Sequence, residues 1–325
     1  MIKDAELKYG VGALLYSPAL NVTVAQSVIE GKFSRPYSLA ICLEDSIADD
    51  SVAEAEKQLA ETLQTIYNER NLRDIYCPKI FIRVRSAEQI IRIFDSIGKM
   101  QEIVCGFVIP KYTVTNADSY NEAIIEINGK AKRKMYMMPI LESQNIVDFS
   151  TRRKVLLELK ELIDSVYEYV LNIRVGGNDF SNVFAARRHY DETIYDILPI
   201  ANLLSDILTV FSREYVVSGP VWEFFSSDNG EWKSGLKQEL KLDKVCGFVG
   251  KTVIHPNQIP VVNEAFKVSV KDYEDAKSIL NWDRKGFQVG KSSAGERMNE
   301  VKTHYNWAQK TLMLAKIYGI TEKEG

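Results

Sequence analysis

The sequence predicts an α/β fold, a TIM (β/α)8 barrel followed by a C-terminal helical extension. The first observation is a series of eight short, nearly continuous apolar runs spread along the chain. The second is that amphipathic stretches, with apolar residues three and four apart, separate several of these runs. The third is that neither a GxGxxG fingerprint nor a Walker A sequence occurs, which favours a barrel over an open doubly wound sheet.

The apolar runs are predicted to be parallel strands covered on both faces. They comprise residues 12–19, 38–46, 79–86, 106–112, 135–143, 169–177, 214–221 and 247–256. Helices are predicted over residues 49–70, 87–100 and 192–213, and a further helix begins within 257–266. We place the barrel at residues 1–270 and a polar, helical extension or lid at 271–325. Within the extension, the Gly- and Ser-rich stretch 283–300 is either a flexible lid or a surface connection.

Composition limits the partners. With 46% hydrophobic and 26% charged residues the chain has the make-up of a globular protein. Its net charge of -3, with basic residues dispersed along the chain, argues against nucleic acid as a partner. No signal peptide and no apolar run of about 18 residues is apparent. We therefore expect a cytoplasmic protein with no membrane partner.

The cysteines give no indication of a metal site. Cys42, Cys77, Cys105 and Cys246 lie far apart and form no CxxC pair, so that zinc is not expected. We predict that all four are small buried core thiols in a reducing compartment.

Polar residues gather where the predicted strands end, which is the edge at which TIM barrels carry their active sites. In chain order they are Glu44 and Asp45, Arg83 and Arg85, Lys111, Glu142, Asp179 and His255.

The two arginines of the third run are predicted to point to the same side of that strand, because side chains alternate along a strand. If that side is the barrel interior, each guanidinium needs a carboxylate or an anionic ligand, since a lone buried charge is costly. Arg83 and Arg85 therefore either bind an anionic substrate or form internal ion pairs with Glu44 or Glu142.

Two acidic residues on neighbouring strands suggest a metal site. Glu142 and Asp179 would repel each other unless a proton or a cation lies between them. With no Cys or His beside them, the oxygen ligands suit Mg²⁺ or Mn²⁺, which also binds water and substrate. The alternatives are an acid at a helix N-terminus for Glu142 and a plain N-cap for Asp179. Gly176 and Gly177 would allow a ligand or backbone to approach closely, and His255 is predicted to be structural.

The order of the strand motifs resembles that of a known family. The motifs are "LLYSPA", "CLEDSI", "IRVRS", "GFVIPKY", "PILES", "VGGNDFS" and "GFVGKTVIHPNQIPVVNEAF". Together, over about residues 10–270, they resemble the citrate lyase beta-subunit-like branch of the HpcH/HpaI aldolase superfamily, which includes malyl-CoA lyases.

The resemblance implies a Mg²⁺-dependent carbon-carbon bond lyase or aldolase. Such an enzyme would act on a 2-oxo acid, a hydroxy acid or an acyl-CoA thioester through a metal-stabilised enolate. By motif, Glu142 and Asp179 correspond to the metal ligands, and Arg83 to the arginine that binds the substrate and steadies the intermediate. Glu44, Lys111 and Arg85 lie on the substrate side of the site. The resemblance also implies a homotrimer or homohexamer.

Several positions depart from the family pattern. Gly12 and Ala13 replace an Arg-Ser pair, Cys42 replaces an aspartate, and Arg85 replaces an asparagine. Asn299 stands where some of these lyases have a catalytic acid, with Glu300 next to it. Similar stand-alone members are encoded among stress-response genes. The alternatives are therefore a CoA thioester hydrolase or synthase at the same site, or a non-catalytic ligand-binding or scaffold subunit of a stress-response pathway.

Overall fold

The computed structural model describes residues 2–283 and 285–321. The chain forms two compact units, of which the first is Val11–Val262 and the second combines the residues before Val11 with those from Asn263 onward. The division thus falls before the predicted boundary at residue 270. The N-terminal helix, which we had assigned to the barrel domain, belongs to the second unit.

Eight parallel strands form the barrel of the first unit. They are β1 (Ala13–Pro18), β2 (Ser38–Cys42), β3 (Lys79–Arg83), β4 (Val104–Ile109), β5 (Tyr136–Leu141), β6 (Ile173–Val175), β7 (Val217–Ser218) and β8 (Lys251–Val253). The strands are hydrogen-bonded in the order β7-β6-β5-β4-β3-β2-β1-β8. A parallel bridge between Gly219 and Lys251 joins the two ends of this order and closes the barrel. Each predicted strand is present, and the TIM-barrel prediction is confirmed.

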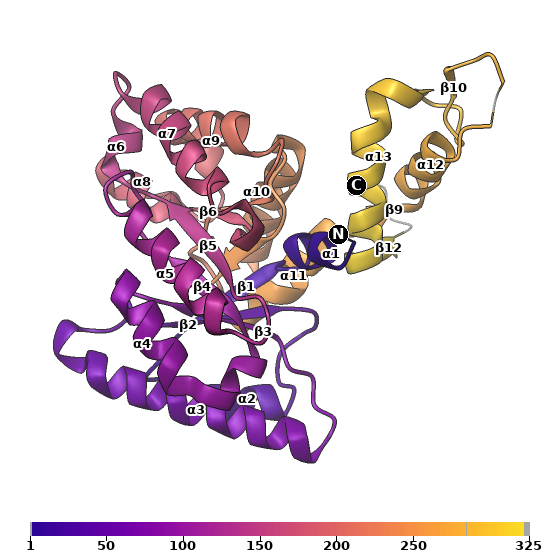
Figure 1. The fold of residues 1–325 in the computed structure, drawn as a ribbon. Helices are drawn as coiled ribbons and strands as arrows, with labels where there is room; N and C mark the ends of the chain where they lie inside the picture. Colours follow the sequence, from indigo (N-terminus) through magenta and orange to yellow (C-terminus); the bar gives the residue numbers. More distant parts are fainter. Residues whose placement is uncertain (1, 284, 322–325) are drawn as a thin grey trace. The chain divides into compact units, whose positions relative to one another are not determined.

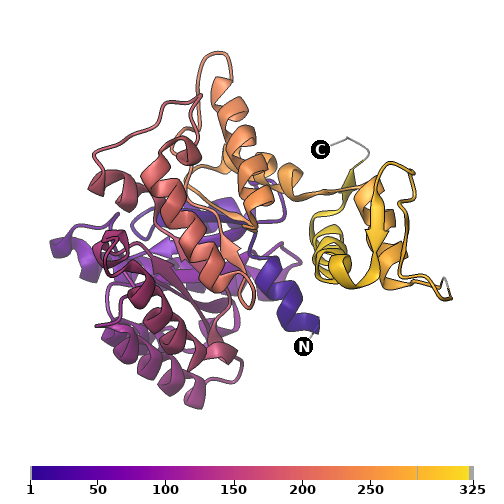
Figure 2. The ribbon, with the colours of Figure 1, turned by 90° about the horizontal axis from the view of Figure 1, so that it is seen from above.

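Helices surround these strands (Figures 1 and 2). They are α2 (Val24–Ile29), α3 (Val52–Leu72), α4 (Ala87–Ile97), α5 (Ala117–Lys130), α6 (Gln144–Val147), α7 (Arg152–Asp164), α8 (Gly177–Val183), α9 (Leu198–Phe211) and α10 (Glu231–Cys246), with 3-10 turns η1 (Asp49–Ser51), η2 (Gly98–Glu102), η3 (Tyr167–Tyr169), η4 (Ile194–Asp196) and η5 (Pro256–Gln258). The predicted helices correspond to α3, α4 and α9, and α11 (Ile259–Phe266) follows η5 as expected.

Helix α4 illustrates why these segments are helical. The Ser86 side chain caps its N-terminus by accepting a hydrogen bond from the Gln89 amide. Ile90, Ile93 and Ile97 are three and four residues apart and all are buried. None of the helices within residues 2–283 and 285–321 is long and apolar enough to cross a membrane.

A buried group of charges joins β8 to α10. The Lys251 ammonium lies 2.9 Å from Glu239 Oε1 and 2.7 Å from Asp243 Oδ2, and all three side chains are fully buried. The Arg188 guanidinium lies 3.5 Å from Glu239 Oε2. Two cations therefore balance two carboxylates, which is the condition under which buried charges are tolerated.

The second unit is built on α12 (Val270–Leu280) and α13 (Val301–Tyr318), whose buried Ala276, Ile279 and Ala308 pack together. Its other elements are α1 (Ile2–Tyr9), β9 (Val268–Ser269), β10 (Val289–Lys291), β11 (Met298–Glu300) and β12 (Ile320–Thr321). The Tyr318 hydroxyl donates a 2.9 Å hydrogen bond to the Tyr9 carbonyl, which ties α1 to α13.

The stretch 283–300, predicted to be a flexible lid or a surface connection, lies between the helices of the extension. Its described residues contain an antiparallel hairpin in which Gly290 pairs with Asn299, and Gly295 takes a left-handed φ of 75° in the connection. Asn299 is buried on β11, and Glu300 occupies the N-cap position of α13. The lid role, and any catalytic role of these two residues, remain predictions.

The cysteine prediction is correct only in part. Cys42 and Cys105 are buried, Cys77 is half-buried and Cys246 is exposed. Cys246 is the last residue of α10, and the chain turns away at Gly247 with a φ of 114°. The apolar run that follows Cys246 is what misled the prediction, because the thiol belongs to the helix end and not to the strand.

Candidate active site

A cavity of about 440 Å³ lies at the C-terminal ends of the barrel strands. It is lined by Tyr16, Ser17, Pro18, Cys42, Asp45, Ser46, Arg83, Ile140, Glu142, Arg174, Val175, Gly176, Gly177, Asn178, Asp179, Val221, Thr252 and Ile254. Three of the predicted site residues, Arg83, Glu142 and Asp179, therefore face one space. All the lining residues belong to the first unit.

Glu142 and Asp179 meet at the wall of this cavity. Glu142 follows β5, and Asp179 lies in the first turn of α8, directly after β6. Burial, together with the neighbouring charge of Asp179 and a hydrogen bond with it, raises the pKa of Glu142 from 4.5 to about 8. A divalent cation bound by both carboxylates would displace the proton from Glu142 into solvent, because the cation offsets the repulsion between the two acids.

Neither structural alternative accounts for these acids. Gly176, and not Asp179, is the N-cap residue of α8, and no side chain caps that helix. Glu142 lies before the N-cap residue of α6, Ser143, and accepts a 2.8 Å hydrogen bond from the Lys111 amide of a different loop. Neither acid caps a helix, and the two interact with each other.

The donor set suits Mg²⁺. Within residues 2–283 and 285–321, no group of three or more His, Cys, Asp and Glu side chains is arranged to hold a metal ion. Two carboxylates that face an open cavity suit the coordination preference of Mg²⁺. This ion usually binds one or two protein carboxylates, and water and substrate occupy its remaining coordination positions. Glu142 and Asp179 would be its protein ligands.

Gly176 makes the approach of the two acids possible. A Cβ atom at this position would lie 2.3 Å from Glu142 Cβ, 2.4 Å from Glu142 Oε2 and 3.0 Å from Asp179 Oδ2. The two distances to Glu142 are too short for non-bonded atoms, so any side chain here would displace that residue. Gly176 was predicted to let a ligand or the backbone come close. In the structure it is the side chains of Glu142 and Asp179 that come close to it.

Replacing Gly176 with alanine should weaken both the fold and the metal site. We expect a loss of about 1–3 kcal/mol in the free energy of unfolding, the usual cost of overpacking, and weaker Mg²⁺ binding by calorimetry. Gly129→Ala is the matched control, because Gly129 lies in α5 with nothing within 4 Å of the added Cβ, and alanine should stabilise that helix by up to about 1 kcal/mol. Equal urea midpoints for the two variants would contradict this account.

Arg83 is held in an acidic cluster beside the two carboxylates. Its Nη2 lies 2.6 Å from Glu44 Oε2 and 2.7 Å from Asp45 Oδ2. The same nitrogen lies 3.9 Å from Glu142 Oε1. The internal ion pair that the sequence left open is therefore present, and it fixes the guanidinium at the cavity wall.

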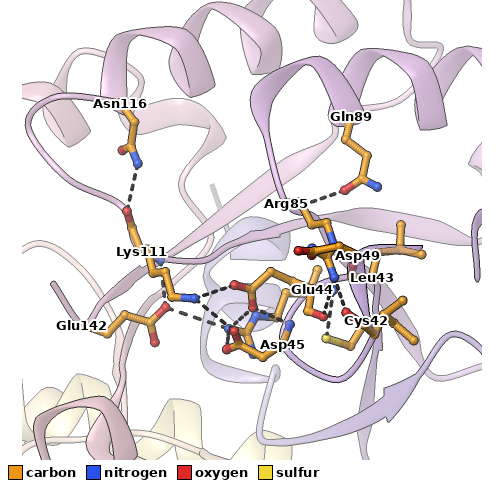
Figure 3. A network of polar contacts seen from close by, with 12 residues as sticks. Cys42, Leu43, Glu44, Asp45, Asp49, Arg85, Gln89, Lys111, Asn116 and Glu142 are labelled. Atoms are coloured by element: carbon orange, nitrogen blue, oxygen red, sulfur yellow. Dashed lines mark hydrogen bonds and ion pairs between the residues drawn. The ribbon is translucent and has the colours of Figure 1, made fainter. Parts of the chain in front are cut away.

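Lys111 connects this cluster to the carboxylate pair (Figure 3). Its ammonium lies 2.7 Å from Glu44 Oε1 and 3.0 Å from Asp45 Oδ1. Its backbone takes a left-handed φ of 48°, uncommon for a residue with a side chain, and its amide donates to Glu142. One residue thus orients acids that follow two different strands, β2 and β5.

Arg85 lies elsewhere. Its guanidinium donates to the backbone carbonyls of Leu43, Glu44 and Ile47 and pairs with Asp49, as Figure 3 shows for Leu43 and Asp49. Strand β3 ends at Arg83, so the alternation that we extended to Arg85 does not reach it. Arg85 holds the loop after β2, which speaks against the substrate contact predicted for it.

The prediction for His255 is supported. Its imidazole Nδ1 accepts a 3.2 Å hydrogen bond from the Asn257 amide, as the N-cap of η5. Its ring stacks on Phe225 with 4.6 Å between the ring centres. These contacts are structural.

The comparison with known families decides the identity. Over residues 5–320 the chain matches the family described as C-C bond lyase of the TIM-barrel fold. The chain belongs to this family. The expectation from the strand motifs of a carbon-carbon bond lyase family with a TIM barrel is thereby confirmed.

Solved structures share the fold of this lyase. CitE from Mycobacterium tuberculosis, in complex with magnesium, acetoacetate and coenzyme A, has a TM-score of 0.60 at 17% identity, covering 95% of this chain and 99% of that one. RipC from Yersinia pestis has a TM-score of 0.54 at 16% identity, covering 81% and 98%. The Mycobacterium tuberculosis citrate lyase beta subunit with oxaloacetate and magnesium has a TM-score of 0.50 at 16% identity, covering 80% and 98%. No curated protein sequence gives a significant match.

The lyase also contains site residues that the sequence analysis missed. Arg174, on β6, lines the cavity together with Tyr16 and Thr252. The signal was a charged residue inside the strand-like segment "LNIRV", five residues before Asp179.

Proposed function

We propose that this lyase is a Mg²⁺-dependent enzyme that cleaves or forms a carbon-carbon bond next to a carbonyl group. Its substrate would be a small 2-oxo acid, a hydroxy acid or an acyl-CoA thioester. The observation that carries the proposal is the pair formed by the buried Glu142 and the partly exposed Asp179, whose carboxylates line the same cavity. The magnesium complexes of CitE and of the citrate lyase beta subunit support it.

Bound Mg²⁺ would act as a Lewis acid that polarises the carbonyl oxygen. Arg83 would donate hydrogen bonds to the oxygen on which negative charge develops, because its guanidinium faces the same cavity. Glu44 and Asp45 hold that guanidinium in place, so that little reorganisation is needed when charge appears.

The size of the cavity limits what enters the barrel. About 440 Å³ is near the lower end of the range for ligand pockets, and it suits an acid of a few carbons. The nucleotide part of a CoA thioester would lie outside it. The homotrimer or homohexamer that the resemblance implies remains part of this proposal.

Product analysis with Mg²⁺ tests the activity. We expect purified protein to split oxaloacetate, malyl-CoA or citramalyl-CoA, and chelation of the metal to stop the reaction. Arg83→Gln should lower the rate by roughly 100- to 1,000-fold, as loss of an oxyanion donor does. Arg92→Gln is the control, since Arg92 forms an exposed ion pair with Glu56 on the helical surface.

The products separate the alternatives. A shorter acyl-CoA together with a 2-oxo acid indicates cleavage, the reverse reaction indicates a synthase, and free CoA with an intact acid indicates hydrolysis. Tight binding of these compounds without any product would contradict the lyase proposal and favour a non-catalytic subunit.

A further inference from the structure

Arg174 is a buried cation in the cavity whose charge no carboxylate compensates. It is only 1% exposed and lies in the middle of β6, beside Ile140 on β5 and Ser218 on β7. Among the residues that the structure describes, none provides an ion pair for it. The other fully buried cation on a barrel strand, Lys251, contacts two carboxylates. Burying a guanidinium without a counter-charge lowers the stability of the fold, unless an anion binds to it.

The contacts of Arg174 are all with neutral groups. Its Nη2 donates a 2.7 Å hydrogen bond to Thr252 Oγ1, and its Nη1 lies 3.4 Å from Asn172 Oδ1. A further hydrogen bond joins the guanidinium to the Tyr16 hydroxyl. The Nε is buried and has no hydrogen-bond partner. The positive charge is thus held in a fixed position, and the N–H group of Nε is unused.

The hydroxyl groups of Tyr16 and Thr252 add two further hydrogen-bond donors beside the Arg174 guanidinium. A guanidinium can only donate, so Tyr16 and Thr252 must accept its hydrogen bonds and each keeps its own hydrogen for another acceptor. Burial raises the pKa of Tyr16, so its hydroxyl is protonated at neutral pH. Tyr16, Thr252 and Arg174 all line the cavity.

This group is distinct from the cluster around Arg83. Arg83 is paired with Glu44 and Asp45, so its charge is already compensated. The Tyr16 ring lies between the two arginines: it faces Arg83, with 5.7 Å from the guanidinium carbon to the ring centre, and it bonds to Arg174 through its hydroxyl. The cavity therefore offers one compensated and one uncompensated guanidinium.

We propose that Arg174, Tyr16 and Thr252 form an anion-binding subsite that takes an oxyanion group of the substrate, away from the carboxylate pair. That this anion belongs to the substrate rests on the function proposed above. A carboxylate and a phosphate offer the same recognition chemistry, because both accept paired hydrogen bonds from a guanidinium. The substrate of this lyase would then carry an anionic group in addition to the carbonyl at which the bond breaks.

Calorimetric titration of the full chain with succinate and with inorganic phosphate, with and without Mg²⁺, tests the subsite. We expect one of these anions to bind, and Arg174→Met to weaken that binding at least tenfold. Whichever anion binds more tightly identifies the class of group. Arg92→Met is the control for loss of a positive charge and should bind as the wild type does.

The melting temperature of Arg174→Met distinguishes a ligand-binding role of Arg174 from a structural role. If Arg174 serves a ligand, methionine should leave the melting temperature unchanged or higher, because an uncompensated buried charge is removed. If Arg174→Met fails to fold, Thr252→Val and Tyr16→Phe provide the test, since each keeps the arginine and should still weaken anion binding.

Two results would overturn the subsite: a wild-type chain that binds neither anion, or variants that bind as tightly as the wild type. Either could occur while Mg²⁺-dependent cleavage is observed, in which case the proposed function stands. Conversely, anion binding that depends on Arg174 in a protein without turnover would reject the lyase activity and keep the subsite.

Discussion

Replacing Glu142 with glutamine should abolish Mg²⁺ binding and at the same time stabilise the metal-free protein. Glutamine has the shape of a protonated glutamate and can still accept the hydrogen bond from the Lys111 amide. It removes the charge that Asp179 opposes, so the free energy of unfolding at pH 8 should rise by roughly 1–4 kcal/mol. Calorimetry should show Mg²⁺ affinity falling by more than about 100-fold, since even indirect supports of a metal cost 10- to 100-fold.

The pH dependence gives a second measurement. A carboxyl whose pKa is higher in the folded protein than in the unfolded chain binds more protons when folded, so its contribution to stability is present below pH 4.5 and is lost as the pH rises to about 8. Urea unfolding of the metal-free wild type should show this loss, and Glu142→Gln should lack it. Added Mg²⁺ should restore the stability of the wild type, most strongly near pH 8.

Glu161→Gln is the matched control, because Glu161 is exposed on α7. It should change neither Mg²⁺ affinity nor the pH profile. A Glu142→Gln variant that binds Mg²⁺ like the wild type would rule out Glu142 as a ligand. A variant that is destabilised at pH 8 would show that the two carboxylates do not oppose each other in the folded protein.

Lys251→Met should be the most destabilising substitution in the barrel, with a loss of about 3–5 kcal/mol in the free energy of unfolding. Methionine fits the space, but Glu239 and Asp243 would remain fully buried with only Arg188 to balance them. Burial already raises the pKa of Asp243, and loss of the ammonium should raise it further. Urea unfolding at pH 7 measures the effect.

A second substitution tests the cause. Asp243→Asn keeps an oxygen for the hydrogen bond from Tyr195 and removes the uncompensated charge, so the double variant should recover part of the lost stability. Lys237→Met on the exposed face of α10 should have little effect. If Lys251→Met and the double variant are equally destabilised, the loss comes from packing and not from charge.

Much of the barrel and the centre of its site follow from the sequence alone. The strands could be found because both faces of a barrel strand are buried, and the resulting apolar runs need no knowledge of their neighbours. Glu142 and Asp179 could be paired in advance because they end consecutive runs, and consecutive parallel strands of a barrel have their carboxyl ends side by side. Residue type then indicated Mg²⁺.

The remaining features depend on direction and on distant partners, which only the tertiary structure provides. Where both faces of a strand are apolar, no period shows which residue points inward, so the presence of Arg174 in an apolar run did not show that its side chain faces the cavity. Alternation could not give the direction of the Arg85 side chain, because it holds only while the strand continues and β3 ends two residues earlier. The site cluster joins residues 31 to 67 positions apart in the chain. Such contacts are fixed by strand register and loop conformation, and local sequence patterns predict neither of these.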